Sequence, residues 1–92
     1  MRGIEQTNAY KKDLRREGRG PNLTILNSVL PEVLSDLANG IPLVPKYRDH
    51  KLTGEWEGCR DCHLKPDLVM IYEVSDEVVI LHRIGSHATL FG

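Results

Sequence analysis

The stretch that decides the fold runs from Leu68 to Ile84 and reads Leu-Val-Met-Ile-Tyr-Glu-Val-Ser-Asp-Glu-Val-Val-Ile-Leu-His-Arg-Ile. Leu68 to Val74 is a nearly continuous apolar run, which is typical of a strand that is buried on both faces. Glu77 to Ile84 repeats the pattern, and Ser75-Asp76 between the two runs is a short turn compatible with a hairpin. The stretch therefore predicts two adjacent antiparallel strands.

The residues before this hairpin predict two helices, two further strands and a long connection. Thr7 is an N-cap candidate for a helix over Ala9 to Glu17, which Gly18 and Gly20 end. A second helix is expected from apolar residues at helical spacing, with Asn39-Gly40 as its stop and a kink or fresh start at Pro31; these residues are Leu23, Leu26, Leu30, Val33, Leu34 and Leu37.

Shorter segments complete the expected fold. Gly3 to Asn8 is a candidate opening strand, and Cys59 to Leu64 is a short, mixed third strand. Gly40 to Gly58, rich in proline and glycine, predicts a long irregular connection of the kind that is often functional. Together the elements predict a single α+β domain over residues 1–92, with two helices and an antiparallel sheet.

Composition and length limit the function classes. The 92 residues are 40% hydrophobic and 27% charged, which is ordinary for a globular chain with one modest core. No run of some 18 apolar residues is present to span a membrane, and Met1 to Tyr10 lacks the apolar stretch of a secretory signal. Two cysteines do not make a disulfide framework, so we expect a reducing, cytoplasmic location.

The cations are unevenly distributed although the net charge is only −1. Five fall on the first expected helix, namely Lys11, Lys12, Arg15, Arg16 and Arg19. A second, looser set accompanies the histidines and consists of Lys46, Arg48, Lys51, Arg60, Lys65 and Arg83. The net charge argues against a polyanion-binding surface over the whole chain, but a local basic face can still bind phosphates. For the first set, a merely solvated helix face is an equal alternative.

Cys59-x-x-Cys62, followed directly by His63, has the residue types of a metal site. On an extended strand, however, positions 59 and 62 point to opposite faces. The chain also lacks a second cysteine pair to complete a tetrahedral zinc site. We therefore expect neither a metal ion nor a disulfide at these cysteines, and we expect Trp56 to anchor the long connection on the body of the domain.

Three histidines lie beside turn signals or strand ends in the second half of the chain: His50, His63 and His87. Strand alternation puts Asp61 on the same face as His63, and the turn Lys65-Pro66-Asp67 should return Asp67 near His63. His50 precedes these strands and Arg83 ends the last one, so all these groups can meet at one edge of the sheet. By the same alternation, His82 faces away from Arg83.

That constellation suits cleavage of a phosphodiester through the RNA 2′-hydroxyl. A base would take the hydroxyl proton, a cation would stabilise the charge on phosphorus, and an acid would protonate the leaving 5′-oxygen. No metal is required for this chemistry. Purely structural histidines in a binding domain are the alternative interpretation.

From Tyr47 onward the chain resembles the YafQ branch of the RelE/ParE superfamily, the toxins of bacterial type II toxin–antitoxin pairs. The resemblance rests on four stretches, which are Tyr47 to Leu52, Gly54 to Gly58, Arg60 to Asp67, and Arg83 to Phe91. It implies two helices packed on a twisted antiparallel sheet. It also implies a ribosome-dependent endoribonuclease that cuts mRNA in the ribosomal A site and is neutralised by a cognate antitoxin.

The resemblance further implies which residues carry the function. The catalytic positions are His50, His63, Asp67 and His87, while Phe91 helps to place the RNA and Arg83 contacts phosphate. We also expect Asp61 and Lys51 to contact the substrate, the basic first helix to dock on ribosomal RNA, and no cofactor. The alternative on this fold is a non-enzymatic inhibitor of DNA gyrase, as in ParE-type toxins, which has no use for a histidine-rich site.

Overall fold

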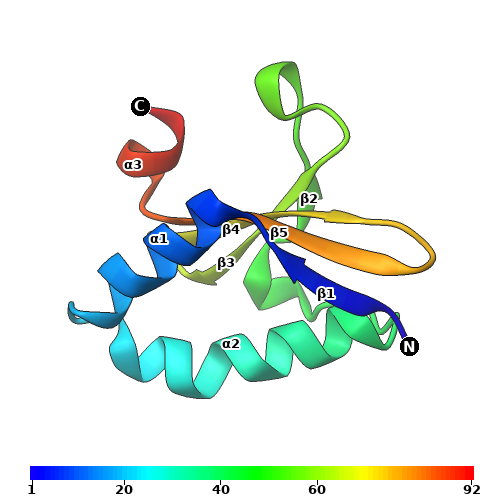
Figure 1. Cartoon of the computed structure of the whole chain (residues 1–92), viewed down its shortest axis with the longest axis horizontal. Helices are drawn as coiled ribbons and strands as arrows, with labels where there is room; N and C mark the ends of the chain where they lie inside the picture. Colours follow the sequence, from blue (N-terminus) through cyan, green and yellow to red (C-terminus); the bar gives the residue numbers. More distant parts are fainter.

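The expected hairpin lies inside a five-stranded sheet in the computed structural model, which describes residues 1–92 (Figure 1). The strand order is β1-β5-β4-β3-β2, with bounds Gly3–Gln6, Val78–Gly85, Leu68–Val74, Arg60–Lys65 and His50–Lys51. Neighbouring strands pair antiparallel except β1, which runs parallel to β5. The α+β class is thus confirmed, with one departure from an all-antiparallel sheet. Since β1 opens the chain and both helices separate it from the hairpin, no tight turn forces it to be antiparallel to β5.

Two helices lie on one side of this sheet, α1 (Asn8–Gly18) and α2 (Leu23–Ala38) (Figure 1). Thr7 is the N-cap of α1, and its side chain accepts a hydrogen bond of 3.0 Å from the N–H of Tyr10. A fresh helix start at Pro31, one of the two expected outcomes, is wrong because α2 continues through it. Pro31 leaves the carbonyl of Asn27 without its helical donor, but both residues are exposed, so water can satisfy that carbonyl.

The main core fills the space between the helices and the sheet. It is formed by Tyr10, Leu30 and Val33 from the helices and by strand residues that include Cys62, Met70 and Leu81. The other face of the sheet carries a smaller apolar cluster of Cys59, Val69, Ile71 and Leu90, and we call this side the open face. The two cysteines are free and lie on opposite faces, as strand alternation predicts.

Three short helical segments also shape the site. The connection before β3 is less irregular than expected, since it holds η1 (Pro45–Tyr47), strand β2 and η2 (Gly54–Trp56). Trp56 packs against the open-face cluster, which confirms its anchoring role. The C-terminal helix α3 (His87–Phe91) was not expected; Ser86 caps it by accepting from the N–H of Thr89.

Helix α1 closes the edge of β5 beyond the point where β1 ends. The hydroxyl of Thr7 donates to the carbonyl of His82, and the carboxylate of Asp13 accepts from the N–H of Ile84. Arg16 donates to the carbonyl of Ile84 at 3.0 Å. These side chains occupy backbone groups that an exposed edge strand would otherwise offer to another chain. No helix in the structure has the length and apolar character needed to cross a membrane.

Candidate active site

The three histidines named from the sequence form a row across the end of the open face. The ring centroids of His50 and His63 are 6.2 Å apart, and those of His63 and His87 are 5.1 Å apart. Phe91 extends the row, with its ring centroid 6.2 Å from that of His87. The side chains of His50 and His87 are 55% and 51% exposed, whereas that of His63 is 9% exposed. Two accessible imidazoles therefore flank a buried one.

Asp61 lies beneath this row and is almost completely buried. Its Oδ1 atom is 3.0 Å from Nδ1 of His50 and 4.0 Å from Nε2 of His63. No well-directed hydrogen bond reaches that oxygen, because Nδ1 of His50 is also 2.8 Å from the carbonyl of Arg48. Burial raises the pKa of the Asp61 carboxyl, and the nearby charges of His50 and His63 oppose that rise. The Asp61 side chain is only 4% exposed and contacts the histidines, and its expected contact with the substrate stays a prediction.

Asp67 contacts His87, which differs from the expected position beside His63. Its Oδ1 atom lies 2.8 Å from Nδ1 of His87 and accepts a second hydrogen bond, of 3.0 Å, from the backbone N–H of His87. These two hydrogen bonds lower the pKa of Asp67, so it is ionised near neutrality. Nδ1 of His63 instead faces the carbonyl of Pro66 at 3.4 Å. Sequence alternation could not foresee this pairing, because it depends on helix α3.

A tight turn before β2 aims His50 at Asp61. Arg48 has a left-handed backbone with φ 51°, and Asp49 is anchored by the hydroxyl of Tyr72 at 2.5 Å and by Nε of Arg60 at 3.0 Å. Burial and the bond to Asp49 raise the pKa of Tyr72 above its ordinary range, so the phenol remains a hydrogen-bond donor. The main core thus fixes the backbone that carries His50.

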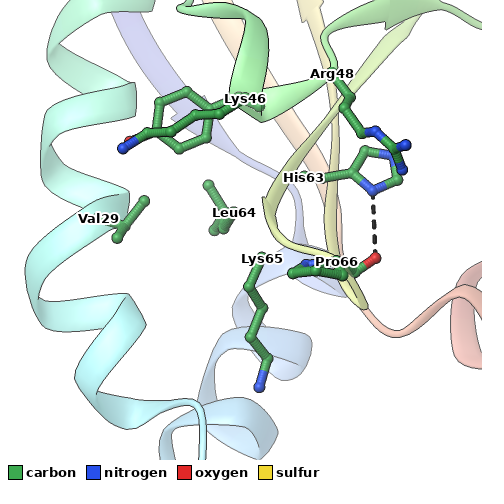
Figure 2. A pocket seen from close by; sticks show the side chains of 8 residues that line it. Val29, Lys46, Arg48, His63, Leu64, Lys65 and Pro66 are labelled. Carbon is green, nitrogen blue, oxygen red and sulfur yellow. Dashed lines mark hydrogen bonds between the residues drawn. The ribbon is translucent and has the colours of Figure 1, made fainter.

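A pocket with three cations lies next to His63 (Figure 2). Lys46, Arg48 and Lys65 line it together with His63, and Val29, Tyr47, Leu64 and Pro66 supply the remaining walls. Lys46 also lies over the ring of Tyr47, 5.2 Å from its centroid. The second basic set in the sequence pointed to these cations, although their individual roles were not assigned. Their charge suits a phosphate-bearing ligand.

The structure does not bring Arg83 to the histidines. Nε and Nη2 of Arg83 bind the carboxylate of Asp13 at 2.6 and 3.1 Å, and Arg16 binds the same carboxylate at 2.7 Å. A bulge in the β4–β5 pairing interrupts the alternation there, since Ile71 pairs with Arg83 whereas Tyr72 pairs with Leu81. Asp13 thus holds Nε and Nη2 of Arg83, and Nη1 is the guanidinium nitrogen that it does not bind.

The remaining named residues are distributed as follows. Lys51 lines a separate hollow beside Cys59 and Arg60, away from the histidine row. In the first basic set, Arg16 hydrogen-bonds Asp13, Glu17 and the carbonyl of Ile84. The other four members are exposed and make no such bonds; they are Lys11, Lys12, Arg15 and Arg19. His82 lies on the open face and hydrogen-bonds Glu73.

The donor set of His50, Asp61 and His63 also has the geometry of a metal site. One potential ligand atom from each lies within 4.8 Å of the other two. Two imidazoles and a carboxylate suit borderline divalent ions such as Zn²⁺. Bound there, such an ion would occupy nitrogen lone pairs that proton transfer needs.

A histidine row beside a cationic pocket, at the strand ends of a small α+β domain, is what the resemblance to the ribonuclease toxins of the RelE/ParE superfamily implies. Residues 2–92 match the family described as the bacterial toxin of type II toxin–antitoxin system, YafQ. The chain belongs to this YafQ family.

Individual members of the family are similar to this protein over nearly its whole length. The mRNA interferase toxin YafQ of Escherichia coli K12 is 36% identical over 93 residues, which cover 100% of this chain and 98% of that protein. The crystal structure of the E. coli DinJ–YafQ toxin–antitoxin complex contains a chain with a TM-score of 0.84 and 36% identity, covering 99% of this chain and 98% of that one. A metal-bound toxin from Helicobacter pylori has a TM-score of 0.83 and 39% identity, covering 99% of this chain and 100% of that one.

Proposed function

We propose that this protein is an mRNA interferase, an endoribonuclease toxin that cleaves mRNA in the ribosomal A site. The observation that carries the proposal is the row of His50, His63 and His87 with one buried and one exposed carboxylate beside a cationic pocket. Membership in the YafQ family and the likeness to an mRNA interferase support it. A gyrase inhibitor of the ParE type would not need such a row.

We assign the general acid to His87. Asp67 holds Nδ1 of His87, which leaves Nε2 free to deliver a proton to the departing 5′-oxygen. The ionised Asp67 orients the imidazole through Nδ1, so the pair resembles the orienting carboxylate and histidine of other acid–base sites.

We assign the general base to His50, at the other end of the histidine row. His50 is exposed and lies next to Asp61, so it can take the 2′-hydroxyl proton while the buried carboxylate stabilises the imidazolium that forms. His63 lies between the two exposed histidines and is too buried for extensive contact with solvent. We assign His63 to positioning the reacting phosphate together with the cations of the pocket. Proton transfers of this kind need no metal ion.

Phe91 and the basic pocket would place the RNA. The Phe91 ring is 45% exposed next to His87, where it can stack on a base. Lys46, Arg48 and Lys65 would hold phosphates on the other side of His63. Arg83 would contact a phosphate through Nη1, which does not bind Asp13.

The proposed partners are the ribosome with its mRNA and a cognate antitoxin, which places the action in the cytoplasm. The DinJ–YafQ complex supports the antitoxin, because a relative that matches this chain over nearly its whole length is part of a toxin–antitoxin complex there. Coexpression with the neighbouring open reading frame should yield a stable heteromeric complex, in which a segment of the antitoxin becomes ordered on binding. Repeated failure to purify the two together would contradict this part of the proposal.

The test of the activity is incubation of the purified chain with translating ribosomes, followed by mapping of mRNA 5′ ends. We expect new ends within A-site codons, and none when the same mRNA is incubated without ribosomes. Intact mRNA, together with inhibition of DNA gyrase supercoiling, would reject the interferase and favour the ParE-like alternative.

A further inference from the structure

A second group of metal-ligating side chains lies on the open face, separate from the histidine row. Cys59 precedes β3, Glu73 is on β4 and His82 is on β5. The Cys59 sulfur, a carboxylate oxygen of Glu73 and a ring nitrogen of His82 all lie within 4.8 Å of one another. We propose that these three residues bind a zinc-like divalent transition-metal ion.

The donor chemistry and spacing suit such an ion. Zn²⁺ binds thiolate, imidazole and carboxylate at about 2.0–2.3 Å, so two ligands of one tetrahedral ion are roughly 3.3–3.8 Å apart. Nε2 of His82 is already 3.1 Å from Oε1 of Glu73, so small rotations of two side chains would complete the arrangement. A thiolate in the set favours zinc, cobalt or copper over magnesium and calcium, which prefer oxygen ligands.

The surroundings also fit a site that an ion can enter from solvent. Cys59 is buried at 8% exposure, whereas the side chains of His82 and Glu73 are 25% and 47% exposed. The three protein ligands leave a fourth position for water. Burial, reinforced by the charge of Glu73, raises the pKa of the free Cys59 thiol, so metal binding would release a proton.

The proposal is compatible with the earlier argument that Cys59 and Cys62 do not form a metal site together. Cys59 and Cys62 still cannot share an ion, since they lie on opposite faces of the sheet. The partners of Cys59 are instead supplied by the neighbouring strands, with His82 at the bulge of β5. The proposal departs from the expectation that Cys59 carries no metal. The alternative is a His–Glu pair near the surface beside an inert thiol. Such surface pairs contribute little to the stability of the fold.

A bound ion would tie the loop that carries η2 to the centre of the sheet. The N–H of Cys59 donates to the carbonyl of Trp56 at 2.9 Å, and the Trp56 ring lies edge-on to His82 at 6.0 Å. Trp56 is the only tryptophan in the chain, so its fluorescence reports on this site.

Cobalt titration distinguishes this site from the histidine row. A thiolate–Co²⁺ bond gives a charge-transfer absorption in the near ultraviolet, which the sulfur-free set of His50, Asp61 and His63 cannot produce. We expect the intensity of this band to rise as Co²⁺ is added and to reach a plateau when each protein chain has bound one ion through its thiolate. The fluorescence of Trp56 should change in parallel. Cys59→Ser should abolish the band, and Cys62→Ser should retain it.

Two variants at accessible positions guard against effects on folding. His82→Gln and Glu73→Gln leave the core untouched. Each should weaken the affinity of the protein for Co²⁺, measured from the intensity of this band, at least about tenfold, while the circular dichroism spectrum stays unchanged. Absence of the band in the wild-type protein, or its survival in Cys59→Ser, would overturn the proposal. So would unchanged affinity in both Gln variants.

Discussion

His87 and Asp67 are joined twice, since one carboxylate oxygen accepts from the backbone N–H and lies 2.8 Å from Nδ1 of the ring. The first bond fixes the start of α3, and the second fixes the imidazole that we assign as the general acid. A residue in the β3–β4 turn thereby orients a residue 20 positions later in the chain. The two bonds separate the chemical role of His87 from the orienting role of Asp67, and the two can be tested independently.

Replacing His87 by Ala should reduce the single-turnover rate of mRNA cleavage by about 10²-fold or more, which is the usual loss for a proton-transfer group. Ribosome binding and the circular dichroism spectrum should remain unchanged, since the side chain is half exposed. Thr89→Ala is the matched control in the same helix, because Ser86 caps the backbone N–H of that residue, which the substitution keeps. Equal losses in both variants would mean that the fold of α3 matters and not the imidazole.

Asp67→Asn should slow cleavage about tenfold or more while leaving the protein folded. Asn keeps the size of the side chain but removes the negative charge that lies beside Nδ1 of His87. Glu77→Gln, an exposed acid in the β4–β5 turn, is the control and should cleave at the wild-type rate. If Asp67→Asn also cleaves at that rate, the carboxylate has no part in catalysis.

Local sequence rules could predict the strand hairpin, the capped first helix and the shared face of Asp61 and His63, because each depends on residues close in the chain. They could not predict the partner of Asp67, since the five-residue helix α3 is held by Leu90 packing on Val69 and Ile71. Nor could they predict Asp13 as the partner of Arg83, 70 residues away. The bulge in β5 also broke the strict alternation by which His82 was expected to face away from Arg83. The roles of the four catalytic candidates remain predictions.

Asp13→Asn should destabilise the protein by about 1.5–3 kcal/mol, the range for hydrogen bonds to charged groups. Burial alone would raise the pKa of Asp13, but bonds from Arg83, Ile84 and Arg16 hold it below the ordinary 3.8. A lowered folded-state pKa means that this stability is present above pH 3.8 and is lost as the pH falls through the folded pKa.

Urea denaturation at several pH values tests this. The wild-type protein should lose stability below about pH 4 more steeply than Asp13→Asn, so the two curves converge in acid. Asp76→Asn, in an exposed turn, should keep the wild-type profile. A constant difference between wild type and Asp13→Asn at all pH values would contradict the role of the ionised carboxylate.

Removing metal ions should leave cleavage intact, and adding Zn²⁺ should inhibit it. The inhibition follows because His50, Asp61 and His63 could hold the ion and would then lose their proton-transfer nitrogens. Cleavage assays in EDTA and then with a Zn²⁺ series measure both effects. Cys59→Ser should remain sensitive to Zn²⁺, which assigns the inhibition to the histidine row. Loss of activity in EDTA that Zn²⁺ restores would instead show that the reaction needs a metal.

The exposed cations of α1 should dock the protein on ribosomal RNA. Lys11, Lys12 and Arg15 are exposed on one side of the helix, whereas Arg16 holds Asp13 and β5 and must be left in place. The triple variant Lys11→Ala, Lys12→Ala, Arg15→Ala should weaken ribosome binding and flatten its dependence on salt. Each lost phosphate contact lowers the slope of log K against log salt by about 0.7–0.9, so three contacts lower it by roughly 2–3.

A control with the same net charge, Thr24→Glu, Asn27→Glu, Ser28→Glu, adds its acids on exposed positions of α2 and should retain most of the slope. Equal slopes for the wild type and the α1 variant would show that this helix face is merely solvated.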